Sequence, residues 1–194
     1  NVPWDIAFLP DGQMLVTERP GTLRRIGQHP FSFPIPAVAG AGEGGLMGIA
    51  LHPDFVTNHL VYLYYTTTDP LRNRVARFKL EGDTLTFEKL IMDNIPSAIY
   101  HDGGQIAFGP DGMLYLTTGD ANSPNNAQDP SSLSGKTLRI TSDFAPSTVK
   151  VQSSVESLGV ISALSTGHEE PVSYWPGGRR PPWSSRRRPV NPLV

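Results

Sequence analysis

Among its 194 residues the sequence contains no cysteine. Disulfide bonds, cysteine-ligated zinc and a catalytic thiolate are therefore excluded, although the lack of cysteine is compatible with any redox compartment. No apolar run reaches the roughly 18 residues that a membrane span needs. An excess of one charge is also lacking, since 16 Lys and Arg stand against 18 Asp and Glu, a net charge of −2. This balance argues against a dedicated partner of nucleic acid or of an anionic membrane surface.

The sequence also lacks helical patterning. No stretch shows the 3.6-residue apolar period of an amphipathic helix over two or more turns. Glycine and proline are abundant instead, with 19 residues of each. In a chain that is otherwise apolar enough to fold, these residues indicate many turns between short strands. We therefore expect an all-β fold.

One pattern of strand, Pro-Asp turn and strand occurs three times. The Pro-Asp pairs stand at 10–11, 53–54 and 110–111, flanked by β-branched and aromatic residues. Proline fixes its own φ angle, and Asp followed by Gly favours a tight reversal. A repeat of roughly 40–50 residues built from short strands is typical of β-propeller blades. The sequence thus predicts a partial β-propeller of about three blades, with further strands at 22–26, 74–80 and 136–140.

Three regions are expected along the chain. Residues 1–140 contain the repeats and form the partial propeller. Residues 141–176 diverge from the pattern and contain no Pro-Asp turn, and residues 177–194 form a tail with five Arg, four Pro and no acid. The tail could be a basic arm for an acidic partner. A disordered or non-native tail is the favoured interpretation, because the first 140 residues offer no basic face that such an arm would extend.

A histidine stands directly before a pair of glycines at the start of the third repeat, in Tyr100-His101-Asp102-Gly103-Gly104. Histidine is the side chain best suited to accept a proton near neutral pH. The two glycines remove side-chain bulk and are expected to let a ligand approach the backbone. Taken alone, such a histidine could equally be an ordinary surface-loop residue.

Four segments together resemble one family, the soluble quinoprotein sugar dehydrogenases (the glucose/sorbosone dehydrogenase family, which includes the aldose sugar dehydrogenases). They occur in family order at 15–21, 42–55, 100–112 and 135–140. The resemblance covers roughly residues 3–140. It implies a six-bladed propeller, the cofactor PQQ (pyrroloquinoline quinone), calcium, and oxidation of aldose sugars at C1 to lactones. Family habit also implies a periplasmic or extracellular location, and the electron acceptor stays unspecified.

The resemblance assigns roles to five residues. His101 matches the general base that takes the proton of the sugar C1 hydroxyl, and Asp120 matches the acid that orients this histidine. Glu43 and Gln128 match positions that border the cofactor, and Glu43 and Asp102 are expected to contact the substrate. Asp120 as a turn former and Glu43 as a solvated loop tip remain open alternatives. No metal ligand is assigned, because most calcium ligands of the family lie in its second half.

The sequence departs from the family pattern in two ways. About three blades are present where the family has six, and the family's Gly-His-Arg-Asn-Pro motif reads Gly-His-Glu-Glu-Pro at 167–171. A glutamate in place of that arginine would repel a tricarboxylate cofactor. A shift of reading frame after His168, or a cloning remnant, is one hypothesis for the change. We expect an N-terminal fragment that is inactive alone and self-associates through open blade edges.

A second hypothesis is a non-enzymatic propeller module that binds a protein or carbohydrate partner. Propellers of the Hedgehog-interacting type, which belong to the same wider group, bind proteins without redox chemistry. Those proteins are rich in cysteine, and its absence here disfavours this alternative.

Overall fold

The computed structural model describes residues 2–40, 42–144 and 160–161. Within them the chain forms three four-stranded antiparallel sheets, each connected in sequence order. Sheet one consists of β1 (Pro3–Phe8), β2 (Met14–Glu18), β3 (Thr22–Ile26) and β4 (Phe31–Pro34). Sheet two consists of β5 (Leu46–Leu51), β6 (Leu60–Thr68), β7 (Leu71–Glu81) and β8 (Thr84–Pro96). Sheet three consists of β9 (Gly103–Phe108), β10 (Leu114–Thr118), β11 (Thr137–Ile140) and β12 (Val160–Ile161).

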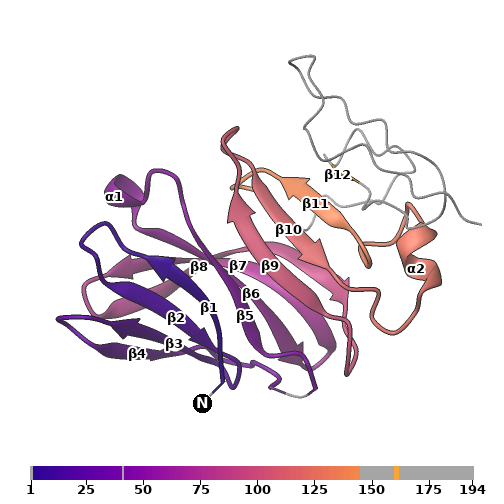
Figure 1. Ribbon diagram of the computed structural model, residues 1–194, viewed down its shortest axis with the longest axis horizontal. Helices are drawn as coiled ribbons and strands as arrows, with labels where there is room; N and C mark the ends of the chain where they lie inside the picture. Colours follow the sequence, from indigo (N-terminus) through magenta and orange to yellow (C-terminus); the bar gives the residue numbers. More distant parts are fainter. Residues whose placement is uncertain (1, 41, 145–159, 162–194) are drawn as a thin grey trace, which may run out of the picture.

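The sheets are arranged as neighbouring blades (Figure 1). The first strand of each blade lies beside the first strand of the next, so that β5 contacts both β1 and β9. The all-β class and the partial propeller are therefore confirmed. Two four-residue helices interrupt the strands, α1 (Phe55–Asn58) and α2 (Asn125–Gln128). Neither is long or apolar enough to cross a membrane, and the described residues hold no other candidate span.

The Pro-Asp pairs form the reversals that the repeat predicts in sheets one and three. The Asp11 carboxylate accepts a hydrogen bond from the Gln13 amide at 3.0 Å, and the Asp111 carboxylate accepts one from the Met113 amide at 3.1 Å. The second repeat differs, because Asp54 precedes α1 and makes no side-chain capping bond. There the strands are joined by a helical turn rather than by a tight reversal.

The inner strands of sheet two, β5 and β6, are buried on both faces. Side chains alternate along a strand, so Leu63 and Tyr65 of β6 pack against sheet one, while Tyr62 and Tyr64 pack against sheet three. This explains why β6 reads as an almost continuous apolar run. Leu15 from sheet one and Ile106 from sheet three complete the two cores, and both are at least 98% buried.

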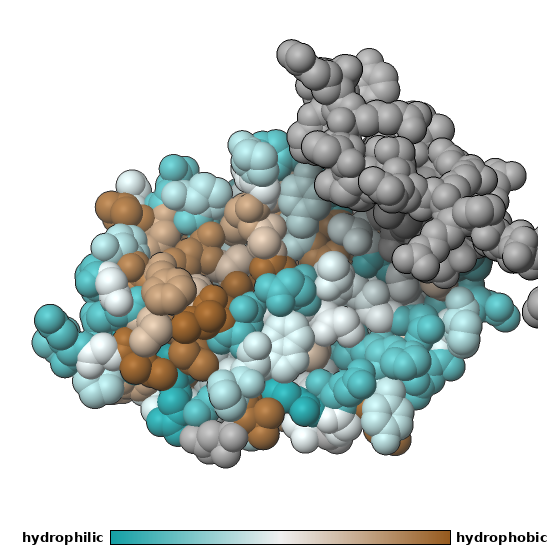
Figure 2. Space-filling model, in the orientation of Figure 1, coloured by the Kyte–Doolittle hydropathy of each residue, from teal (hydrophilic) through white to brown (hydrophobic). Residues whose placement is uncertain are grey.

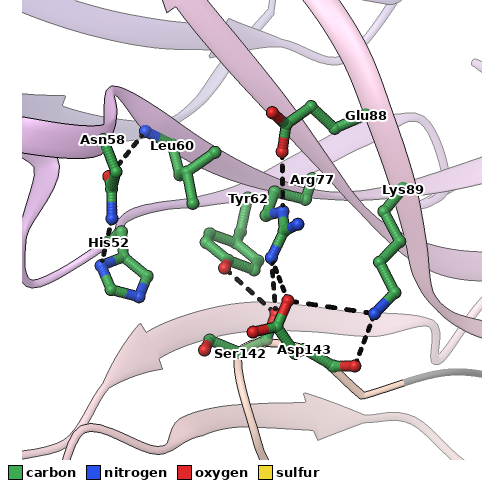
Figure 3. A network of polar contacts seen from close by, with 9 residues as sticks. All are labelled: His52, Asn58, Leu60, Tyr62, Arg77, Glu88, Lys89, Ser142 and Asp143. Carbon is green, nitrogen blue, oxygen red and sulfur yellow. Dashed lines mark hydrogen bonds and ion pairs between the residues drawn. The ribbon is translucent and has the colours of Figure 1, made fainter.

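A polar clasp ties sheet three to sheet two at the end where β11 finishes (Figure 3). Arg77 donates to the Asp143 carboxylate at 2.5 Å and to the Ser142 carbonyl at 3.4 Å, and its Nε contacts Glu88 at 3.0 Å. Lys89 donates to the Asp143 carbonyl at 2.6 Å. The clasp holds the chain segment that follows β11 against β7 and β8.

Several sequence predictions concern residues that lie outside the part of the chain that the structure describes. The changed motif at 167–171 and the basic tail at 177–194 lie outside the described residues. The same holds for the stretch 145–176 except for residues 160 and 161.

Candidate active site

Three loops meet at one end of sheets two and three. They are the β4–β5 loop with Glu43, the β8–β9 loop with His101 and the β10–β11 loop with Asp120. Strands β9 and β10 are antiparallel, so the start of β9 lies beside the end of β10, with Gly103 opposite Thr118. Strand topology therefore brings together side chains that are far apart in the sequence.

The imidazole of His101 and the carboxylate of Asp120 form a hydrogen-bonded pair. His101 Nδ1 lies 2.9 Å from Asp120 Oδ1. The histidine side chain is 59% exposed and the aspartate side chain 22% exposed. Asp120 Oδ1 also accepts the Asn122 amide at 3.0 Å, which fixes the carboxylate. An ionised carboxylate can only accept, so Nδ1 is the donor in this pair, and a neutral ring then has its lone pair on Nε2.

The backbone of His101 is held in a left-handed conformation, with φ of 65°. Its amide donates to Glu43 Oε2 at 2.7 Å, and its carbonyl accepts from the Ala121 amide at 3.2 Å. The same carbonyl lies so close to Gly119 that a Cβ there would stand 1.6 Å from it. Strain at this position is thus offset by contacts from the other two loops.

Glu43 is exposed, and its loop is anchored by Arg19. The Arg19 guanidinium donates to the Gly44 carbonyl at 3.2 Å and also bonds the Gly42 carbonyl. The Glu43 amide donates to the Ile99 carbonyl at 2.8 Å. Glu43 therefore stands beside His101, and one of its carboxylate oxygens positions the histidine backbone.

The structure buries Asp102, which sequence analysis expects to contact the substrate. The residue is 1% exposed, and its Oδ1 accepts from Asn73 Nδ2 at 2.9 Å and Ser97 Oγ at 2.8 Å. A carboxylate enclosed in this way cannot reach a ligand in the open site. The expected substrate contact is therefore corrected to an internal role.

The expected purpose of the two glycines is also corrected. A Cβ at Gly103 would meet the Gly119 amide nitrogen at 2.7 Å, and one at Gly104 would meet the Met47 side chain at 3.0 Å. Protein atoms, rather than a ligand, occupy the space that the missing side chains leave. The φ angles of 72° and 108° give a second reason for glycine at both positions.

Gln128 is exposed on α2, which lies within the β10–β11 loop that also carries Asp120. Asn126 of the same helix donates to the Asp120 carbonyl at 3.1 Å. Lys136, which is 3% exposed, stabilises the helix by donating to the Asn126 and Ala127 carbonyls at 2.7 and 3.1 Å. Sequence reasoning placed Lys136 in a strand and did not predict its contact with this helix, because nothing in a strand pattern shows which loop a lysine will hold.

The described residues hold no group of three or more His, Cys, Asp or Glu that could bind a metal ion. A cavity of about 310 Å³ lies away from the site, between sheets one and two beside α1, and its lining includes Leu9, Phe55 and Leu80. The site itself is an open surface formed by loops. The groups that it presents to solvent include the His101 imidazole, whose Nδ1 is oriented by Asp120.

Fold and site together define a partial β-propeller with a hydrogen-bonded histidine and aspartate at one end of the blades. A family model described as glucose/sorbosone dehydrogenase matches residues 1–173, which takes the match past residue 140. The chain belongs to the glucose/sorbosone dehydrogenase family.

Solved and curated relatives agree with this assignment. The PQQ-bound aldose sugar dehydrogenase of Streptomyces coelicolor superposes with a TM-score of 0.68 and 40% identity, covering 74% of this chain and 45% of the relative. Quinoprotein glucose dehydrogenase B of Acinetobacter calcoaceticus is 30% identical over 218 residues, 92% of this chain and 45% of the relative. The human Hedgehog-interacting protein is 29% identical over 96 residues, 43% of this chain and 14% of that protein. The chain thus spans less than half the length of these relatives.

Proposed function

We propose that this chain carries the general base of a quinoprotein dehydrogenase that oxidises aldose sugars at C1 to lactones. The observation that carries the proposal is the pairing of an exposed His101 with Asp120 at 2.9 Å. Family membership and the PQQ-bound neighbour support sugar oxidation as the reaction class.

The proposed chemistry follows from the free ring nitrogen. His101 Nε2 takes the proton of the sugar C1 hydroxyl while hydride leaves C1, so that the C–O bond becomes the lactone carbonyl. Asp120 stabilises the imidazolium that forms and keeps the proton on Nδ1 before the reaction. When bound, PQQ supplies the two-electron acceptor for that hydride.

Glu43 and Gln128 are proposed to border the sugar and the cofactor. Both are exposed and lie on the loops that flank the base. Glu43 has a second carboxylate oxygen besides the one that accepts the His101 amide, and this oxygen is available for a sugar hydroxyl. Gln128 offers an amide that can both donate and accept.

The described residues do not supply the cations that bind an anionic cofactor, and they do not supply the ligands that bind a metal ion. PQQ is a tricarboxylate and needs cations, but the Arg19 guanidinium is already bonded to the carbonyls of its neighbouring loop, and Lys136 is bonded to three carbonyls. Calcium needs several oxygen ligands, and no acidic cluster was found among the described residues. We therefore propose that the groups that bind PQQ and calcium lie elsewhere, that the chain is inactive alone, and that the enzyme works in the periplasm or outside the cell.

Dye-linked aldose oxidation tests the proposal. The 194-residue chain, supplied with aldose, PQQ and calcium, should show no turnover. In the protein at the full length of its relatives, aldose should be oxidised, and His101→Gln should lower kcat by about 10²–10⁴-fold, the usual contribution of a general base. Unchanged kcat in His101→Gln contradicts the assignment of the base. Robust turnover by the short chain contradicts its inactivity.

The alternative of a binding module rests on the similarity to the Hedgehog-interacting protein. This alternative is favoured if the full-length protein neither binds PQQ nor oxidises aldoses, but binds a protein or carbohydrate partner saturably.

A further inference from the structure

A network of buried polar groups extends through sheet two, behind the open site. The Gly45 amide donates to Thr66 Oγ1 at 3.2 Å, and the Thr66 hydroxyl donates to Asn73 Oδ1 at 2.7 Å. Asn73 Nδ2 in turn donates to Asp102 Oδ1 at 2.9 Å. The three side chains are each at most 1% exposed. One end of this network lies in the loop of Glu43, and the other end lies in the loop of His101.

Asp102 is the point where most of these bonds converge. Its Oδ1 also accepts from Ser97 Oγ at 2.8 Å and from the Ala98 amide at 3.2 Å. Its backbone carbonyl accepts the Tyr64 hydroxyl at 3.1 Å. Burial raises the pKa of Tyr64, and the nearby Asp102 charge raises it further, so the hydroxyl stays a donor. The residue next to His101 is thus fixed through both its side chain and its backbone.

A buried carboxylate is expensive, which makes its presence informative. Removing a charge from water is strongly unfavourable unless hydrogen bonds or a counter-ion replace the solvent. Within the described residues Asp102 Oδ2 is buried without a hydrogen-bond partner, and no ion pair to Asp102 is formed among them. Charge-assisted bonds to Oδ1 offset part of the cost. Such networks add rigidity to the groups that they hold.

We propose that Asp102, through Asn73 and Thr66, is a positioning residue that locks the loops of His101 and Glu43 together from the inside. The lock holds His101 in its left-handed conformation, where its ring meets Asp120 and its amide meets Glu43. This proposal rests on the proposed function only for its catalytic meaning. The geometry that it explains, one tautomer of one exposed histidine, is measurable without any turnover.

The test is the ring ¹⁵N NMR spectrum of the full 194-residue chain, recorded at a pH at which its histidines are neutral. His101 signals are assigned by their loss in His101→Gln. Four variants are compared with the unmodified chain: Asp102→Ala, Asp102→Asn, Ser97→Ala and Asp111→Asn. Asp111→Asn is the matched control, because it removes a carboxylate that bonds Arg139 at the far end of the same sheet.

Asp102→Ala should lose the pure Nδ1–H signature and give averaged ring shifts for His101. Asp102→Asn keeps an acceptor oxygen and should largely restore the signature, while Ser97→Ala should give a partial loss. Asp111→Asn should lower stability without moving the His101 signals. An unchanged tautomer in folded Asp102→Ala overturns the proposal, as does an equal change in Asp111→Asn.

If Asp102→Ala does not fold, Ser97→Ala and Thr66→Val decide the matter. An unchanged His101 tautomer in both then overturns the proposal. The outcome is independent of enzymatic activity: a protein that oxidises no aldose but shows this pattern loses the proposed function and keeps the positioning role.

Discussion

At the scale of single residues, the site depends on one histidine in an unfavourable backbone conformation. A left-handed φ costs a residue with a Cβ about 1–2 kcal/mol, and His101 has a φ of 65°. The hydrogen bonds from its amide to Glu43 and from Ala121 to its carbonyl offset this cost. Because each bond comes from a different loop, the conformation reports whether all three loops are correctly placed.

Gly119 is the residue at which this arrangement is most easily disturbed. A Cβ there would lie 1.6 Å from the His101 carbonyl oxygen, so Gly119→Ala must push the two loops apart. We expect a loss of unfolding free energy of about 1–3 kcal/mol, the usual cost of overpacking, together with a changed His101 ring spectrum. Chemical denaturation and NMR measure the two effects.

Gly112→Ala is the control for this prediction. Gly112 has a φ of 72°, and a Cβ added there would have no other atom within 4 Å, so it tests backbone strain without a clash. The substitution should lower stability by about 1 kcal/mol and leave His101 unchanged. Equal spectra of His101 in the two alanine variants would contradict the proposed coupling of the loops.

Sequence motifs predicted two residues that the structure brings into contact. His101 and Asp120 stand in motifs, and the structure brings them together, although their roles remain proposals. The buried members were not predictable. Asn73 lies in a strand between two arginines, and only the tertiary packing shows that it faces inward toward Asp102. Asp102 itself was expected at the substrate, because a sequence does not show which neighbour of a histidine points into the core.

At the scale of elements, turn chemistry predicted the fold better than strand patterns did. Pro-Asp pairs located the blades, and strands at 22–26, 74–80 and 136–140 were found as β3, β7 and β11 within a few residues. Strand β8 was missed because register shifts along its pairing with β7 break the two-residue alternation. Strand β4 was missed because it has four residues and ends in proline, as edge strands can.

The clasp between sheets two and three gives a prediction about pH. The hydrogen bond from Arg77 lowers the pKa of Asp143 below the value of about 3.9 for an unfolded Asp. A lowered folded-state pKa adds stability that is present above about pH 4 and is lost as pH falls through the folded pKa. Asp143 is largely exposed, so Asp143→Asn should cost only about 0.2–1 kcal/mol at pH 7. The difference should vanish near pH 2.

Chemical denaturation of the unmodified chain and Asp143→Asn across this range measures the effect. Arg77→Met should remove most of the same pH-dependent increment, because the Arg77 hydrogen bond is the largest cause of the lowered pKa of Asp143. A stability difference that persists unchanged at pH 2 would show that Asp143 acts by packing rather than by charge.

At the scale of the whole molecule, sheet one presents an apolar face to solvent. Figure 2 shows hydrophobic residues gathered over this part of the surface. Ile6, Phe8 and Ile26 are 45%, 67% and 42% exposed, and Phe8 and Ile26 flank Met14 in the register of β1, β2 and β3. An apolar sheet face of this kind favours association, in keeping with the expectation that the chain self-associates.

Phe8→Lys tests this association. A buried Phe contributes about 1.5–3 kcal/mol, so replacing it by a charge should weaken self-association at least about tenfold, as followed by analytical ultracentrifugation. Val56→Lys on α1 is the control, since Val56 is 72% exposed but lies off this face. A chain that is monomeric at all concentrations, with or without Phe8→Lys, would contradict the expected self-association.

The role of His101 as an oriented base is tested most sharply by its ring ¹⁵N spectrum in the unmodified chain and in Asp120→Asn. We expect a neutral imidazole with its proton on Nδ1 and a free Nε2 in the unmodified chain, and mixed tautomers in the variant. An unmodified chain whose His101 carries its proton on Nε2, or whose spectrum does not change in Asp120→Asn, would show that this histidine is not held as a base.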